Sequence, residues 1–180
     1  MTKIFRPDVS NVHYPLLLRD AHDRSNLNAL NFRKMADNWT PIHFEFYVGE
    51  KKTGRRPDIT YILPCLAFRT ELQDLIFPFK SDDLEFLPIV ASGEDWLIVN
   101  CLLTTNGYDE AKSLLHRDQT GQIFMVQKLT VTAPLPESSE LFTIDGSNRA
   151  YTYLLESLVD RIKGLKLDGL TFKEIGRITK

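Results

Sequence analysis

The sequence predicts an α+β protein with a single domain, in which a mostly antiparallel or mixed sheet is accompanied by a few short helices. Three observations lead to this prediction. The chain has 180 residues, 43% of them hydrophobic and 26% charged, which suffices for one substantial core. Apolar runs of strand length recur between clusters of Gly, Pro, Asn and Asp. Helical patterns, in contrast, are few and short.

Residues 1–40 are expected to form an irregular or helical segment that packs on a main domain of residues 41–180. This segment contains polar clusters, and its one helical candidate, Leu27 to Trp39, has only a partial apolar stripe. Thr40 and Pro41 end the helical pattern, because proline cannot continue a helix. The main domain then begins with a strand.

Strands and one short helix are predicted in the first part of this domain. Ile42 to Val48 alternates in the way that is typical of a half-buried strand. Residues 50–58 combine Gly, Pro and charge, which indicates an exposed loop. A buried strand, Ile59 to Phe68, follows. After it we expect a short amphipathic helix that has Thr70 as its N-cap and stops at Pro78.

The middle of the chain predicts a hairpin. Leu84 to Val90 and Trp96 to Leu103 are apolar runs, and residues 91–95 between them have the composition of a turn. Residues 108–115 are expected to make one or two helical turns. Gln122 to Val131 then forms a further strand.

The C-terminal part predicts short strands around one helix. Leu141 to Ile144 and Tyr151 to Leu155 have the length and composition of short strands. Ser157 begins a capping pair for a helix from Leu158 to Lys163, which Gly164 is expected to end. Leu170 to Ile175 alternates as a closing strand does.

Charge and cysteine usage disfavour several classes of function. Lys and Arg total 22 against 24 Asp and Glu, a formal net charge of −2, which gives no general attraction to nucleic acid or to membranes. Cys65 and Cys101 lie in apolar runs, where cysteine usually behaves as a small buried hydrophobe, so a disulfide is disfavoured. Pro15 to Leu18 is too short for a signal-peptide core, and no later run approaches a membrane span. We expect a cytoplasmic protein.

Short motifs of known enzymes are absent from the sequence. The nine glycines are scattered, so neither a phosphate-binding nor a dinucleotide-binding loop is recognisable. The nucleophile elbow, the S-x-x-K dyad and the H-E-x-x-H zinc helix are also missing. The histidines have no Cys or His companion at zinc-ligand spacing, so we expect no metal and no cofactor. The leading expectation is a protein without catalytic activity.

One alternative is an enzyme. His43 and Glu45 are two residues apart on a predicted strand and therefore share a face, which can orient an imidazole for acid/base chemistry. Together with Asp82 or Asp109 they would make a hydrolase or a nucleic-acid-processing enzyme. Such pairs arise often by chance.

Acidic side chains recur at predicted turns and are candidates for partner binding. By frequency they form a solvated rim, whereas as a patch they would dock on a basic cleft and speed association. Trp96, directly after one of these turns, is either an interface anchor or a core residue. The basic loop of Lys51, Lys52, Arg55 and Arg56 is expected to stay in solvent. The candidate partner-binding residues are Asp82, Asp83, Glu94, Asp95, Trp96, Asp109 and Glu110.

The order of several strand and turn motifs resembles a family of bacterial immunity proteins, the one numbered eleven among the immunity families of polymorphic-toxin systems. The likeness covers roughly the C-terminal three quarters of the chain. The motifs that carry it are Trp39-Thr40-Pro41, Pro57-Asp58-Ile59, Leu84–Ile89, Asp95–Asn100, Tyr108–Ser113, Leu141–Ile144 and Leu167–Phe172.

The resemblance implies a protein that neutralises a secreted toxin in the producing cell. The toxin would be encoded nearby, often be a nuclease, and be bound directly, without contact to nucleic acid or membrane. The resemblance supplies no catalytic residues and no established contact positions. A third hypothesis is an interaction module whose partner is not a toxin.

Overall fold

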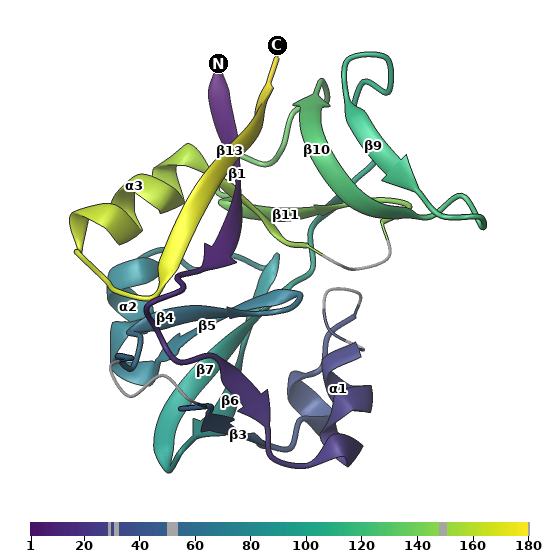
Figure 1. Cartoon of the computed structure of the whole chain (residues 1–180). Coiled ribbons are helices and arrows are strands. Elements are labelled where there is room, and N and C mark those ends of the chain that lie inside the picture. Colours follow the sequence, from purple (N-terminus) through teal and green to yellow (C-terminus); the bar gives the residue numbers. More distant parts are fainter. Residues whose placement is uncertain (29, 31–32, 50–53, 148–150, 180) are drawn as a thin grey trace.

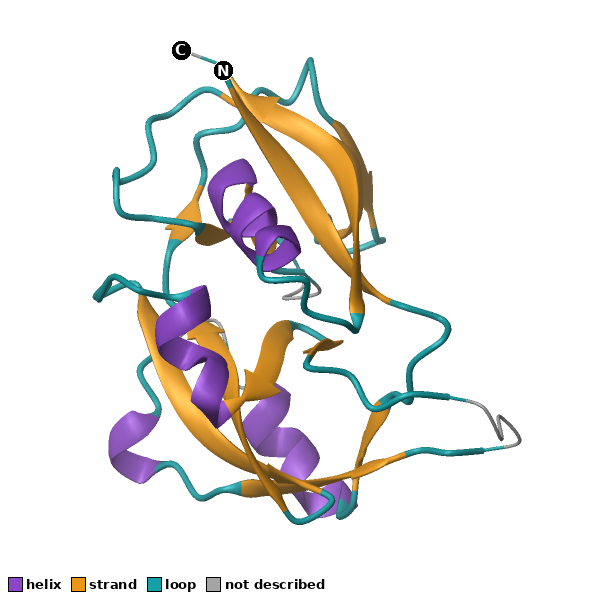
Figure 2. Cartoon of the chain, turned by 90° about the vertical axis from the view of Figure 1, so that its left-hand side faces the viewer, coloured by secondary structure: helices purple, strands orange, loops and turns teal. Residues whose placement is uncertain are grey.

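Strands dominate the protein, and they form two sheets. The computed structural model describes residues 1–28, 30, 33–49, 54–147 and 151–179. In both views the seven-stranded sheet lies at the top and the six-stranded sheet below it, with the two chain ends together at the top (Figure 1, Figure 2). Each sheet mixes antiparallel with parallel pairs, and the helices are short. The arrangement agrees with the predicted class and is compatible with a single α+β domain.

The six-stranded sheet is built around the predicted central hairpin. Leu84 pairs with Cys101 at one end of this hairpin, and Ala91 pairs with Glu94 at its turn. The prediction of this hairpin is confirmed, and so is the preceding strand that begins at Ile42. In order across the sheet, the strands are β2 (Leu16–Leu18), β3 (Ile42–Phe46), β6 (Leu84–Ala91), β7 (Glu94–Cys101), β5 (Cys65–Arg69) and β4 (Ile59–Ile62).

The seven-stranded sheet joins the two ends of the chain and curls on itself. Side chains of β10 and β11, which lie near opposite edges of this sheet, fill one core. The two edges also approach each other, since Ile123 N donates to Gly146 O. In order, its strands are β8 (Thr104–Thr105), β11 (Leu141–Ile144), β12 (Tyr153–Leu155), β1 (Thr2–Val9), β13 (Leu170–Ile178), β10 (Ile123–Val131) and β9 (Leu114–Arg117).

The N-terminal residues differ from the irregular or helical segment expected for 1–40. Residues 2–9 form β1, which pairs with β13 along its whole length. Their strand partner lies about 160 residues away in sequence, so no local pattern reveals it. The helix expected over Leu27 to Trp39 is also not found in the residues described there. The helical pieces are instead η1 (Ala21–Asp23), α1 (Arg24–Asn28) and η2 (Ala36–Asn38), and residues 29, 31 and 32 lie outside the described part.

Two further expectations for the middle of the chain are wrong. Ile59 to Phe68 is not one strand but the hairpin of β4 and β5, because Pro64 lacks an N–H for the ladder and the chain turns there. The helix after it begins with η3 (Thr70–Leu72), continues as α2 (Gln73–Ile76), and has no side-chain cap from Thr70. Residues 109–113 make one hydrogen-bonded turn, which agrees with the expected one or two turns, and β9 begins directly after it at Leu114.

Helix α3 (Glu156–Gly164) confirms the predicted helix and packs between the sheets. Its N-cap is Leu155, without a side-chain hydrogen bond, so the expected cap by Ser157 is absent. Arg161 on this helix forms a bidentate ion pair with Glu140, with two N–O distances of 2.6 Å, and donates at 2.8 Å to the carbonyl oxygen of Ile76. The pair therefore ties α3 both to α2 and to the segment before β11.

Three hydrophobic clusters form the core. One lies between the two sheets and includes α3, one covers the outer face of the six-stranded sheet under Leu27 and Leu30, and one fills the curl of the seven-stranded sheet. Cys65 belongs to the second cluster and Cys101 to the first, so the two thiols lie on opposite faces of one sheet and are not joined by a disulfide. Within the described residues, no helix combines the length and apolar character needed to span a membrane.

We expect the two cysteines to resist alkylation in the native protein. Both side chains have no exposed surface, and burial raises the pKa of Cys101 to about 12, so at neutral pH its thiol carries almost no reactive thiolate. Iodoacetamide followed by mass spectrometry should add no label to the native protein and two labels in guanidinium. Native labelling at the unfolded rate would contradict the burial of these groups.

Candidate functional site

The structure disperses the acidic side chains that were predicted to bind a partner. Asp82 and Asp83 precede β6, whereas Glu94 and Asp95 begin β7 at the other end of the hairpin. Each strand of the hairpin has 8 residues, which separates the two groups by about 25 Å. Asp109 is part of the other sheet, where its N–H donates to Thr130 O. The acidic residues therefore form no common patch.

Most of these carboxylates are also occupied by neighbours. Ser139 Oγ donates to Asp83 at 3.0 Å, and Arg56 lies 2.5 Å from Glu94. Asp109 and Glu110 are also paired with cations: Lys112 Nζ lies 2.7 Å from Asp109, and Arg117 pairs with Glu110. The hydrogen bond from Lys112 lowers the pKa of Asp109. Asp82 and Asp95 are exposed and form no ion pair with the residues that the structure describes, but they belong to different ends of the hairpin.

Trp96 is a core residue and presents no surface to a partner. Its side chain is 1% exposed and packs edge-on against Phe46, with ring centroids 5.8 Å apart. The expectation that it anchors an interface is therefore wrong. Strand alternation explains the difference, because Asp95 at the turn points outward and the next residue along the strand must point inward.

The alternative catalytic constellation is not assembled. His43 and Glu45 are exposed on β3 and share a face, and Glu45 accepts a hydrogen bond from Ser92 Oγ at 2.8 Å. His43 pairs with Val90 near the end of β6, whereas Asp82 lies before its start and Asp109 lies in the other sheet. The described residues also contain no group of three or more His, Cys, Asp or Glu side chains that could hold a metal ion.

The predicted basic loop falls partly outside the described residues. Lys51 and Lys52 are not among them. Arg56 contacts other side chains: it pairs with Glu94, and its guanidinium carbon lies 5.2 Å from the ring centroid of Phe46. It therefore stabilises the turn between β6 and β7.

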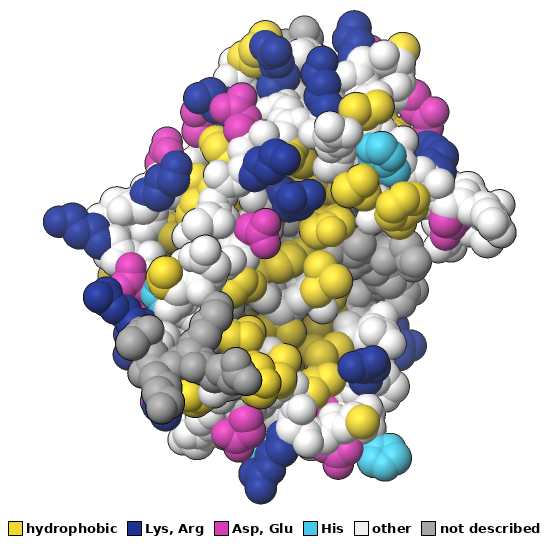
Figure 3. Space-filling model, viewed as in Figure 1, with side chains coloured by type: hydrophobic (Ala, Val, Ile, Leu, Met, Phe, Trp, Pro, Cys, Tyr) yellow, Lys and Arg dark blue, Asp and Glu magenta, His cyan; other side chains and the backbone are white. Residues whose placement is uncertain are grey.

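The strands β9 and β10 project from the body of the molecule and carry exposed apolar side chains (Figure 1). We call residues 114–131 the β9–β10 arm. Leu114 is 48% exposed and Phe124 46% exposed, and the ring of His116 lies 6.2 Å from that of Phe124. On the same face of the molecule, hydrophobic side chains gather in a band flanked by charged ones (Figure 3).

Sequence reasoning did not identify this arm, because it predicts Gln122 to Val131 only as a further strand and Leu114 as part of a helical turn. Ile123, Val126 and Leu129 do point into the core, with a spacing of three rather than two. The pairing of β10 with β9 shifts register twice, between Ile123 and Met125 and between Val126 and Lys128. Phe124 follows the buried Ile123 and, by the alternation of a strand, points outward. Alternation alone does not reveal which of two neighbouring apolar residues faces the core.

A shallow trough follows the line where β10 meets β13. Two depressions of about 440 Å³ each adjoin there and share three residues, Lys128, Thr130 and Arg177. We call them together the β10–β13 trough. A larger depression, of about 600 Å³, lies beside the connection of residues 132–139 and is lined mainly by apolar and hydroxyl side chains. Neither the trough nor this depression gathers the acidic side chains predicted as a site.

The geometry defines a two-sheet protein of α+β class whose described polar groups are spread over the surface and paired locally. No protein-family model matches the chain, and no curated protein matches it significantly. Its function must therefore be argued from its own surface and sequence.

Proposed function

We propose that this chain is an immunity protein, which binds a toxin encoded nearby and neutralises it in the producing cell. The mode of action would be surface docking to another protein, with no chemistry of its own. A nuclease is the kind of toxin that the sequence resemblance favours. The chain would contact neither nucleic acid nor membrane in this role.

The observation that carries the proposal is the exposed apolar surface of the β9–β10 arm. Leu114 and Phe124 leave about half of their side-chain surface in water. Aromatic side chains at the centre of an interface supply most of the binding energy in protein complexes. An apolar aromatic patch on a projecting pair of strands is thus suited to a macromolecular partner.

The arrangement of charge supports docking more than catalysis. Several carboxylates of the described residues are engaged in local ion pairs, as Asp109 and Glu110 are, and the acidic side chains do not converge on one of the depressions. An inhibitor needs a rigid scaffold and an exposed complementary patch. The order of motifs that resembles an immunity family adds support of a different kind, because it comes from the sequence alone.

Growth rescue by co-expression tests the proposal. The wild-type chain should restore growth to cells that express the toxin from the adjacent reading frame. The substitution Phe124→Glu should weaken binding roughly 30-fold, because it removes an aromatic anchor worth about 2 kcal/mol.

The matched control is Phe79→Glu, which changes another exposed aromatic residue, 74% exposed, in the connection before β6. This variant should rescue growth as the wild type does. Failure of the wild-type chain to rescue growth or to bind the toxin would overturn the proposal. Equal rescue by both variants would mean that the β9–β10 arm is not part of the toxin-binding surface.

A further inference from the structure

The β10–β13 trough lies where two parallel strands meet and then separate. Pairing between them covers only Leu129–Val131 with Gly176–Ile178. Toward the lower part of Figure 1, β13 continues beside β1, whereas β10 turns away toward β9. The outer face of the sheet is therefore indented along this junction, and the two depressions mark the indentation.

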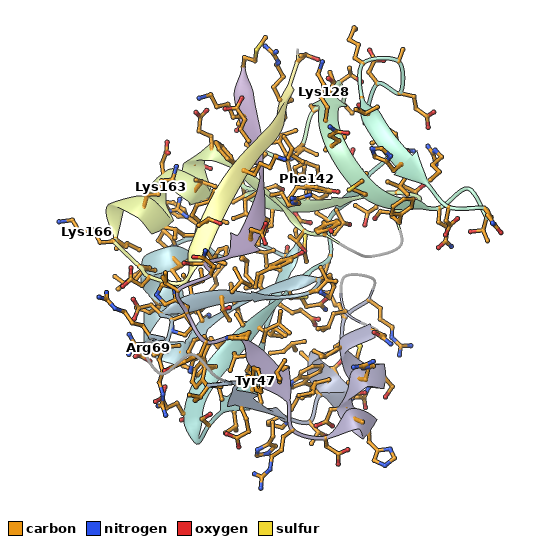
Figure 4. All side chains as sticks on the ribbon, viewed as in Figure 1. Tyr47, Arg69, Lys128, Phe142, Lys163 and Lys166 are labelled. Atoms are coloured by element: carbon orange, nitrogen blue, oxygen red, sulfur yellow. The ribbon has the colours of Figure 1, made fainter. Side chains whose placement is uncertain are left out.

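The cations along the trough exceed the anions that compensate them. Lys128 and Arg177 line both depressions, and neither has an ion-pair partner within the described residues. Among the described residues, the Arg177 guanidinium donates to Met1 Sδ, at 3.4 Å. The third cation, Lys112, is paired with Asp109 at 2.7 Å. Lys128 stands at the top of the molecule in Figure 4.

The one carboxylate in the trough is that of Glu174. It lines the first depression and lies 3.7 Å from Lys3 Nζ, so its charge is already partly compensated. The remaining lining adds hydroxyl groups and apolar surface, from Thr130, Thr179 and Leu114. The trough thus combines two uncompensated cations with neutral surface.

We infer that the β10–β13 trough receives an acidic segment of the partner protein, whose carboxylates pair with Lys128 and Arg177. This inference rests on the proposed function and names the chemistry of the partner at this surface. Complementary charge of this kind accelerates association and selects the partner. The partner-binding surface is then cationic, whereas the sequence predicts an acidic one.

Nucleic acid is the less favourable occupant. A phosphate backbone presents negative charge at every nucleotide, and Glu174 would oppose it within the same depression. A peptide, in contrast, can place a neutral or cationic side chain opposite Glu174 and apolar ones on Leu114. The mixed lining therefore fits a protein segment.

The probe for the test is a capped peptide of alternating Glu and Val, with a Lys-Val peptide and a single-stranded oligodeoxynucleotide as comparisons. In NMR titrations of the full chain, the acidic peptide should shift the amide signals of residues 127–130 and 174–177. Its affinity should fall with rising salt and about tenfold in the double variant Lys128→Glu, Arg177→Glu. The control Lys166→Glu, far from the trough in Figure 4, should leave the affinity unchanged.

Three results would overturn the inference: no shift of these amides, equal binding of the Lys-Val peptide, or tighter binding of the oligonucleotide. The proposed function can fail separately. If the double variant binds and neutralises the toxin as the wild type does, the trough is not its docking surface while the function stands. If the acidic peptide behaves as expected but no toxin is bound, the proposed function fails instead.

Discussion

Replacing Gly169 by alanine should lower the free energy of unfolding by at least about 3 kcal/mol, because two costs combine at this position. The residue has φ +128°, which side chains rarely adopt, and a Cβ would lie 1.9 Å from Ile59 O. The clash is with main chain and cannot be relieved by a rotamer change. Relief requires β4 to move away from the start of β13.

The position matters because the two sheets are joined there by main-chain hydrogen bonds. Asp58 N and Ile59 N donate to Asp168 O at 2.8 and 3.2 Å, whereas the bond from Ser10 N to Gly169 O, 2.9 Å, extends the pairing of β1 with β13 in the seven-stranded sheet. Asp58 also accepts from Asp168 N at 3.0 Å and pairs with Arg69. Any shift of residue 169 therefore disturbs the contact between the sheets as well as the strand itself.

The control for this prediction is Gly93→Ala in the turn between β6 and β7. Gly93 has φ +85°, but a Cβ there would meet no atom within 4 Å. The Gly93→Ala substitution therefore measures only the cost of a side chain at positive φ, which is about 1 kcal/mol of unfolding free energy. Chemical denaturation of both variants gives the comparison, and equal losses of stability would contradict the close contact with Ile59.

Breaking the Arg161–Glu140 pair should cost about 3 kcal/mol of unfolding free energy. The exposed fractions of the two side chains are 23% and 16%, so removing one partner leaves a largely buried charge without compensation. The hydrogen bond to Glu140 also raises the pKa of Arg161, which shows that the charged form is the stabilised one. Glu140→Leu and Arg161→Met should each show this loss in urea denaturation.

The double variant distinguishes a pair from two independent residues. Glu140→Leu together with Arg161→Met removes both charges and should recover most of the lost stability, because neither charge then remains unpaired. Losses that simply add in the double variant would mean that the two side chains do not stabilise the fold as a pair.

Local patterns predicted the elements whose partners are close in sequence. The hairpin of β6 and β7 was predictable because its turn and both apolar runs lie within about twenty residues. Strand β1 was not, since its eight residues gain their partner only when the C-terminal strand is in place. The single long strand expected at Ile59 to Phe68 failed because a proline inside an apolar run outweighed its apolar composition.

The candidate site was less predictable, because a surface depends on how strands are paired. Their position at predicted turns suggests that Asp82, Asp95 and Asp109 form one patch, but the hairpin and the two sheets carry them apart. Phe124 lies beside the buried Ile123 on β10, and the sequence does not reveal which of these two neighbours faces the core. The cations Lys128 and Arg177 come from strands almost fifty residues apart and meet only in the folded sheet.

Hydrogen exchange on the complex tests the central claim most directly, since that claim is docking of a toxin on the β9–β10 arm. Equimolar addition of the toxin from the adjacent reading frame should slow amide exchange in Leu114–Val131. It should leave the β6–β7 turn unchanged. The account would be contradicted if no complex forms, or if a complex forms while exchange in this arm stays as fast as in the free protein.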